Sequence, residues 1–165
     1  MFRREKWGGN YRTYVWYNGA PHAKIADTSN FERGNLGFGF SLDQMLTEKY
    51  GIFGRYSWAD PVLNNIEHHW SLGAQMTGYL WGRNHDVAAI AIGQSVPGKK
   101  YCDVNAFHNT ETQLETYYSF KLNDHVTISP DMQIIWQPNG SLGADGASKD
   151  DSAIFVYGIR TQINM

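Results

Sequence analysis

The chain lacks the features of several common protein classes. Cys102 is the only cysteine in its 165 residues, so no disulfide can form within the chain. Lysine and arginine number 14 against 16 aspartates and glutamates, a formal net charge of −2. That balance provides no basic surface for nucleic acid. The sequence therefore excludes an internal disulfide framework and argues against nucleic acid as a partner.

Long hydrophobic runs are also missing. The longest apolar run is the short VAAIAI of Val87–Ile92, whereas a transmembrane helix needs roughly 18 residues. A helical membrane protein is therefore excluded. The first residues, MFRREKWGG, lack the apolar region of a secretory signal peptide. If the protein is exported, we expect the signal upstream of an internal or truncated start at Met1, or already removed.

Aromatic residues and glycine are abundant. Aromatic residues make up 15% of the chain, and there are 17 glycines, a profile that favours β-structure with tight turns over a helical bundle. The segment His68–Val96 contains two runs rich in apolar residues, joined by the turn-like WGRN. Polar residues interrupt both runs. Such runs raise the question of which solvent each face of a strand meets.

Alternating patterns between turn-forming clusters predict eight β-strands. They are Gly9–Asn18, Asn35–Leu46, Gly51–Trp58, His69–Leu80, Asp86–Val96, Glu111–Leu122, Val126–Gln137 and Ser152–Met165. Most exceed the five or six residues typical of globular strands and match the roughly 9–11 that a tilted strand needs to cross a bilayer.

The predicted connections alternate in length. The short turns are TEKY, WGRN and ND, and the long connections are Gly19–Gly34, Ala59–His68, Pro97–Thr110 and Pro138–Asp151. Outer-membrane barrels show this asymmetry, with short periplasmic turns and longer extracellular loops. The count also places the C-terminus on the short-turn side.

Most of the strands have one apolar and one polar face. In the last strand Phe155, Tyr157, Ile159, Ile163 and Met165 alternate with a second face that includes Arg160, Gln162 and Asn164. The first face suits lipid and the second suits water. The same division applies to the strands Gly9–Asn18, Gly51–Trp58, His69–Leu80, Glu111–Leu122 and Val126–Gln137, whereas the sequence does not assign the faces of Asp86–Val96. Strand length, aromatics near strand ends and charges of both signs on the polar faces favour a membrane barrel over a soluble one.

Several motifs together resemble the carbohydrate-selective porin family (OprB-like). They include GNYRTYVWYNG, GNLGFGFSLDQ, GIFGRYSWADP and the long segment from Glu111 to Gly140, followed by the terminal VYGIRTQINM. The resemblance runs collinearly over nearly the whole chain and matches the C-terminal half of the family's barrel. Its most specific parts are Glu111–Tyr118 and Pro130–Pro138.

The resemblance implies a 16-stranded outer-membrane barrel that passes sugars and other small solutes, ions included, by diffusion. Residues 1–165 would form a single barrel segment of about eight strands with no separate soluble domain. Implied partners are outer-membrane lipid, the barrel-assembly machinery and the remaining N-terminal strands, and a homo-oligomer stays open. The chain ends in Met165, where such barrels usually end in Phe.

No residue set indicates catalysis, a metal site or a cofactor. The six histidines lie mostly in predicted loops or turns, which gives no converging Ser–His–acid arrangement. His68 and His69 are adjacent, and adjacent residues on a strand point to opposite faces. We therefore predict that the protein is not an enzyme.

Charged and aromatic residues on the polar faces are the candidate solute contacts. The candidates are Arg12, Trp16, Asp43, Arg55, Glu115, Asp131 and Arg160. Guanidinium groups donate paired hydrogen bonds to sugar hydroxyls and carboxylates accept them, while Trp16, with Tyr14 in the same phase, offers a flat apolar surface. In the simpler interpretation these charges only solvate a water-filled wall and pair across strands.

Two other classes of function compete with the porin. One is a complete eight-stranded outer-membrane barrel with a structural or small enzymatic role, whose interior is only wide enough to be filled by side chains. The other is a soluble ligand-binding barrel with its apolar side chains inside. Pairing between the first and last strands would favour the complete small barrel, and dependence on detergent separates the soluble barrel from both membrane alternatives.

Overall fold

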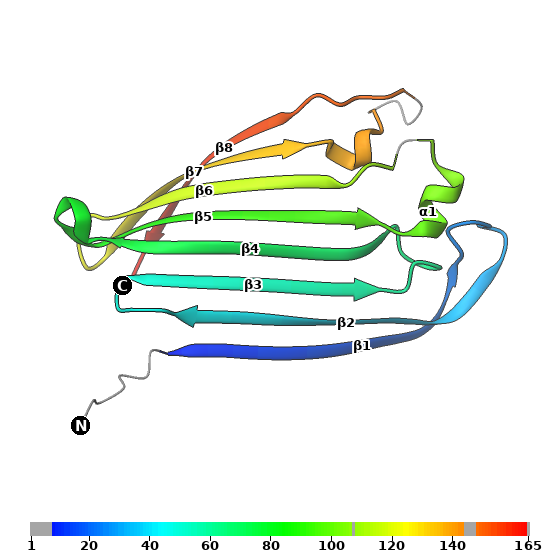
Figure 1. Ribbon diagram of the computed structural model, residues 1–165, viewed down its shortest axis with the longest axis horizontal. Helices are drawn as coiled ribbons and strands as arrows, with labels where there is room; N and C mark the ends of the chain where they lie inside the picture. The colour runs from blue at the N-terminus through cyan, green and yellow to red at the C-terminus, as the bar shows by residue number, and fades with distance from the viewer. Residues whose placement is uncertain (1–7, 107, 144–147, 165) are drawn as a thin grey trace.

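The computed structural model describes residues 8–106, 108–143 and 148–164, which form one antiparallel sheet. Its eight strands lie side by side in chain order, each hydrogen-bonded to its sequence neighbour (Figure 1). The strands are β1 (Gly9–Ala23), β2 (Phe31–Met45), β3 (Tyr50–Ala59), β4 (Ile66–Gly78), β5 (Arg83–Pro97), β6 (Glu111–Lys121), β7 (Val126–Trp136) and β8 (Ile154–Ile163). The predicted all-β up-and-down order is confirmed.

The connections are sorted by length between the two ends of the sheet. Residues 46–49, 79–82 and 122–125 make short turns at one end, where the chain also enters β1 and leaves β8 (Figure 1). Residues 24–30, 60–65, 98–110 and 137–153 connect strands at the other end. The predicted separation of long connections from short turns is confirmed.

The long connections contain short helical segments. The helix α1 (Lys99–Val104) follows β5, and the 3₁₀ segment η2 (Pro138–Ser141) follows β7, both at the long-connection end (Figure 1). A 3₁₀ turn, η1 (Tyr79–Trp81), makes the turn between β4 and β5. Within the described residues, no helix has both the length and the apolar character to cross a bilayer.

The first hairpin extends beyond its predicted bounds. The sequence predicts an end at Asn18, where a turn-like Asn-Gly begins, but β1 continues to Ala23 across a bulge between Asn18 and Pro21. The Asn18 side chain accepts a hydrogen bond from the Ala20 amide at 3.0 Å, so it satisfies backbone that the bulge removes from the ladder. Pro21 is tolerated because it adjoins this bulge, where the ladder is already interrupted.

The structure assigns the faces of β5, which the sequence left open. Ser71 of β4 pairs with Gly93, and Gly93 pairs with Gln113 of β6, so Gly93 shares their polar face. Ala89 and Ala91 lie on that face too, and Ile90 and Ile92 point the other way. The alternation is weak in this strand because small apolar residues occupy both of its faces.

The sheet is open along both edges. In the described part of the chain β1 pairs only with β2, and β8 pairs only with β7. The eight strands therefore do not close on themselves. This rules out the alternative of a complete eight-stranded barrel, which requires pairing between its first and last strands.

A buried acidic residue anchors the short-turn end of β5. Asp86 is only 1% exposed and accepts hydrogen bonds from Arg83, from the Tyr118 hydroxyl at 2.8 Å and from the Lys121 amide at 3.0 Å. The Tyr118 hydroxyl in turn accepts one from the Trp81 indole at 2.6 Å. Because a buried charge is costly unless it is paired, this network holds the β4–β5 turn against the end of β6.

Candidate solute-binding wall

Each strand presents one row of side chains to a common polar face. The rows are set by the pairing of the strands, which runs from Arg12 opposite Ser41, through Arg55 and Ser71, to Ser129 opposite Arg160. All seven candidate solute contacts lie on this polar face, as their alternation predicts. The opposite, apolar face carries exposed large side chains, such as Ile159 at 77% exposure.

Arg12, Asp43 and Arg55 form an ion-paired trio across β1, β2 and β3. The Asp43 carboxylate accepts from Arg12 Nη1 at 3.1 Å and from Arg55 Nη2 at 3.4 Å. All three side chains are at least a third exposed, and such pairs contribute little to stability, typically about 0–1 kcal/mol. For this trio the simpler interpretation, pairing across strands, describes the contacts, and one positive charge remains in excess.

Glu115, Asp131 and Arg160 behave differently. They line a cavity of about 300 Å³ with side chains from five successive strands, β4 to β8, so the sheet curves toward its polar face here. Among the described residues, none of these three side chains has a hydrogen-bond or ion-pair partner in the protein. Their charged atoms are therefore available to water and to a solute.

A second cavity adjoins the first on the same face. It has a volume of about 340 Å³ and is lined by Asp43 and Arg55 together with Gln75, Glu115 and Tyr117. Gln75, Glu115 and Tyr117 also line the first cavity. The polar face thus offers one continuous hollow, which extends from the Asp43 trio to the unpaired group around Arg160.

Aromatic rings cover glycines of neighbouring strands. A Cβ atom built on Gly37 would overlap the Trp16 indole, one built on Gly39 would overlap the Tyr14 ring, and one on Gly73 would overlap Phe53. Each ring therefore rests against bare backbone and lies close to the sheet. Trp16 and Tyr14 in this way present flat apolar surface on the polar face, whereas the Arg55 guanidinium lies over the other side of the Phe53 ring, 4.5 Å from its centroid.

Sequence reasoning missed three residues of the hollow. Gln75 lies on the polar row of the strand, but an uncharged amide gives a weak signal. Phe53 and Tyr117 were passed over because aromatic residues on a polar row break the simple alternation. Phe53 and Tyr117 lie two positions from Arg55 and Glu115 on the same strands, and this spacing, which places them on the same face, was the available signal.

The histidines and the other metal-binding types do not come together. His68 Nδ1 lies 2.8 Å from the Tyr56 hydroxyl and His69 Nδ1 lies 3.2 Å from Ser95 Oγ, on opposite faces of β4 as predicted. In the described ranges no three His, Cys, Asp or Glu side chains cluster closely enough to hold a metal ion.

Carboxylates in the long connections are tied to local turns. The pKa of Asp27 lies below its usual value because the Ser29 hydroxyl and amide donate hydrogen bonds to it. The pKa of Asp151 is lowered chiefly by the ammonium of Lys149. Both carboxylates therefore stay charged under mildly acidic conditions and keep their loops polar.

The family model of the carbohydrate-selective porins, the OprB family, matches residues 2–165. The chain belongs to the carbohydrate-selective porin family. Its backbone also resembles that of Pseudomonas putida OprB solved at high pH, with a TM-score of 0.79 over 95% of this chain, at 18% sequence identity. That likeness confirms the porin fold expected from the sequence.

Two curated relatives are porins of chlamydiae. Porin AaxA of Chlamydia felis is 24% identical over 93% of this chain, and porin AaxA of Chlamydia abortus is 25% identical over 78% of it. This chain spans 36% of the Chlamydia felis porin, 27% of the Chlamydia abortus porin and 44% of the OprB chain. Both relatives carry the name porin, and the matching family model is likewise one of porins.

Proposed function

We propose that this chain forms part of the wall of an outer-membrane porin through which sugars and other small solutes diffuse. The polar face lines the channel and the apolar face contacts lipid. Solute preference comes from pore width and from the groups that line the pore, with no reaction and no cofactor. The observation that carries the proposal is the unpaired group Glu115, Asp131 and Arg160 around one cavity.

The chemistry of that group suits sugars. The Arg160 guanidinium donates several hydrogen bonds in a fixed plane, and the Glu115 and Asp131 carboxylates only accept them. A sugar hydroxyl both donates and accepts, so one ring satisfies groups of both signs. Trp16 and Tyr14 add flat apolar surface for the C–H face of the sugar ring.

The open edges require further strands. Backbone groups without partners are costly in lipid, where no water can satisfy them. We propose that strands outside residues 1–165 complete one barrel with this segment, and that the barrel-assembly machinery inserts it in the bacterial outer membrane. The part of OprB that this chain does not span is large enough to supply such strands. Met165, where such barrels usually end in Phe, lies outside the described residues.

Liposome swelling tests the proposal. In the complete barrel, replacing Arg55, Glu115, Asp131 or Arg160 by Ala should change the ratio of glucose to maltose uptake by about twofold or more, because pore-lining groups set selectivity. Thr127→Ala, on the same face near the short-turn end, is the matched control. Heat-modifiability on a gel should show that every variant folds.

Two results would count against the proposal. If uptake in all four variants equals that of the parent, the charges only solvate the wall. If the four variants fail to fold, the assignment of the polar and apolar faces is reversed.

A further inference from the structure

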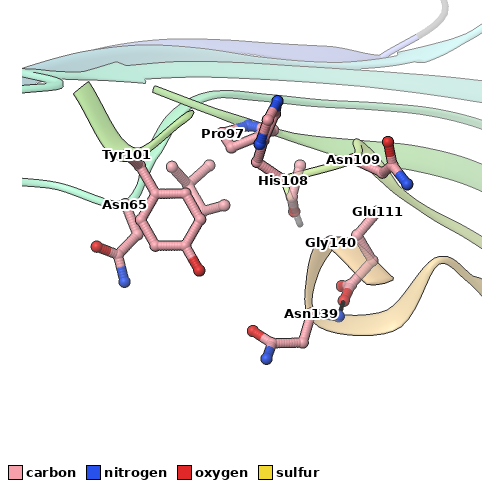
Figure 2. Close-up of a pocket in the computed structure, with 10 residues that line it drawn as sticks. Asn65, Pro97, Tyr101, His108, Asn109, Glu111, Asn139 and Gly140 are labelled. Carbon is pink, nitrogen blue, oxygen red and sulfur yellow. Dashed lines mark hydrogen bonds between the residues drawn. The ribbon is translucent and has the colours of Figure 1, made fainter. Parts of the chain in front are cut away.

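Three long connections enclose a separate pocket at the long-connection end of the polar face. It lies between residues 60–65, residues 98–110 and η2, and it has a volume of about 260 Å³. Figure 2 shows Asn65 and Tyr101 on one side of it and Glu111 with Asn139 on the other. None of the seven candidate solute contacts lies in it.

The pocket contains polar groups without protein partners. Among the described residues, the side-chain amides of Asn65 and Asn139 and the Tyr101 hydroxyl make no hydrogen bond. Glu111 uses only Oε2, which accepts from the Asn139 backbone amide at 2.7 Å. Two amides, one hydroxyl and one carboxylate oxygen are therefore free around the face of a tyrosine ring.

These groups select for a neutral polyhydroxylated ligand. Asparagine amides donate and accept, a carboxylate accepts, and a tyrosine ring provides a flat apolar surface. An anionic ligand would be repelled by Glu111, and one carboxylate is too few for a divalent cation, which prefers about six or more oxygens. Drug-sized ligands occupy roughly 300–1,000 Å³, so a pocket of about 260 Å³ suits a single sugar ring.

The side of the pocket that contains Asn139 is held in a strained backbone. Gln137, Asn139 and Ser141 all have positive φ angles, 53°, 51° and 69°, a region that asparagine tolerates but that glutamine and serine seldom adopt unless their surroundings impose it. The Asn109 amide donates to the Gly140 carbonyl at 3.0 Å, and the Asn109 side chain donates to Ser141 Oγ at 3.0 Å. This side is thus fixed before any ligand arrives, which lowers the cost of binding.

The pocket leads to the hollow of the polar face. Glu111 is the first residue of β6, and Gln113 and Glu115 follow it on the same face. The Gln113 and Gln133 side chains are hydrogen-bonded at 3.0 Å between the pocket and the cavity at Glu115. A solute that leaves the pocket therefore meets hydrogen-bonding groups along the whole descent.

We infer that this pocket is an entry subsite that binds one neutral sugar ring at the long-connection end, before the ring reaches the Glu115 cavity. The inference rests on the proposed permeation of sugars. The ring stacks on Tyr101, with its hydroxyls held by Asn65, Asn139 and the free oxygen of Glu111. As an entry subsite it raises the local concentration of sugar at the mouth without closing the pore.

Saturation-transfer NMR with glucose tests the inference on the complete barrel in detergent micelles. The reference protein for this comparison carries Glu115→Ala, Asp131→Ala and Arg160→Ala, so that the charged groups of the Glu115 cavity are removed. In that background Tyr101→Ala and Asn65→Ala should each weaken glucose binding about five- to tenfold, the worth of one aromatic contact or hydrogen bond. Asp103→Asn, on α1 but outside the pocket, should leave the affinity unchanged.

A second measurement guards against misfolded variants. Tyr101→Phe keeps the ring and removes only the hydroxyl, so it should fold as the parent does and weaken binding by a smaller factor than Tyr101→Ala. In planar bilayers with otherwise unaltered protein, Tyr101→Ala should make glucose-induced interruptions of the current less frequent when glucose is added on the long-connection side.

The possible failures are distinguishable. If glucose permeates but the Tyr101 and Asn65 variants bind it like their parent, the entry subsite is refuted while the porin function stands. If the unaltered barrel neither binds nor passes glucose, the proposed function fails, and the entry subsite fails with it.

Discussion

The indole of Trp16 lies directly over Gly37, its pairing partner on the adjacent strand. No other residue type fits at position 37 without displacing the ring, because even a single Cβ would overlap it. The flat placement of Trp16 therefore depends on the absence of a side chain in β2. This relation ties a structural glycine to a surface that we propose for sugar contact.

Replacing Gly37 should thus alter permeation without touching a charged group. In Gly37→Ala the methyl group displaces the indole away from the sheet, so we expect a narrower pore. The ratio of maltose uptake to glucose uptake should therefore be lower in the variant than in the parent. Liposome swelling measures the ratio. Gly19→Ala in β1 is the control, because a Cβ there makes only ordinary contact with Tyr17; equal ratios in both variants would refute the role of Trp16.

Asp43 should influence the charge preference of the pore. Its loss leaves Arg12 and Arg55 without their shared carboxylate, so Asp43→Ala should shift ion selectivity toward anions. The reversal potential in a KCl gradient reports the shift, which should be larger in dilute salt than near 1 M, where charges are screened within about 3 Å. Arg12→Ala should move the potential in the opposite direction, and a shift of the same sign in both variants would contradict the assignment.

The apolar face should not tolerate charge. Ile159 is near the middle of β8 and 77% exposed on that face, so Ile159→Arg should destabilise the membrane-inserted barrel by about 2–4 kcal/mol. Denaturant unfolding in lipid vesicles measures the change. Gln162→Arg, on the polar face of the same strand, should have little effect, and comparable losses in both variants would mean that β8 does not face lipid.

The buried carboxylate at the short-turn end should matter for stability rather than for transport. Asp86→Ala removes the acceptor for Arg83, Tyr118 and Lys121, and hydrogen bonds to charged groups are worth about 1.5–3 kcal/mol each. We expect a clear loss of unfolding free energy with unchanged glucose uptake. Asp124→Ala removes a carboxylate that is 90% exposed and should change neither quantity.

The edges of the sheet should be its least protected strands. When this chain is expressed alone in detergent, amides of β1 and β8 should exchange with solvent well before those of β4 and β5, because one side of each edge strand has no ladder partner. Hydrogen exchange read by mass spectrometry gives the order. Co-expression with the strands that complete the barrel should protect both edges.

Much of this fold can be predicted from the sequence because most of its strands have one polar and one apolar face. Alternation gave the faces of β8 and β6 directly, and turn-forming clusters placed all three short turns. The faces of β5 needed its neighbours, since Ala88, Ala89 and Ala91 do not distinguish water from lipid. The extension of β1 past Asn18 was hidden because a bulge uses the same residue types as a turn.

The candidate site was only partly predictable. Register places Glu115, Asp131 and Arg160 on one face, but nothing in the sequence says that they remain unpaired while Arg12, Asp43 and Arg55 combine. That difference depends on distances across the curved sheet. The sequence did not predict the pocket around Tyr101, because its residues come from three connections that only the folded chain brings together.

The strictly antiparallel order of the eight strands limits what can complete the barrel. β1 and β8 run in opposite directions. Any up-and-down set of strands that bridges them must therefore contain an even number, with both of its ends at the short-turn side. A second copy of this segment, with its eight strands, meets this requirement for an even number, as does a set of eight strands in the same polypeptide.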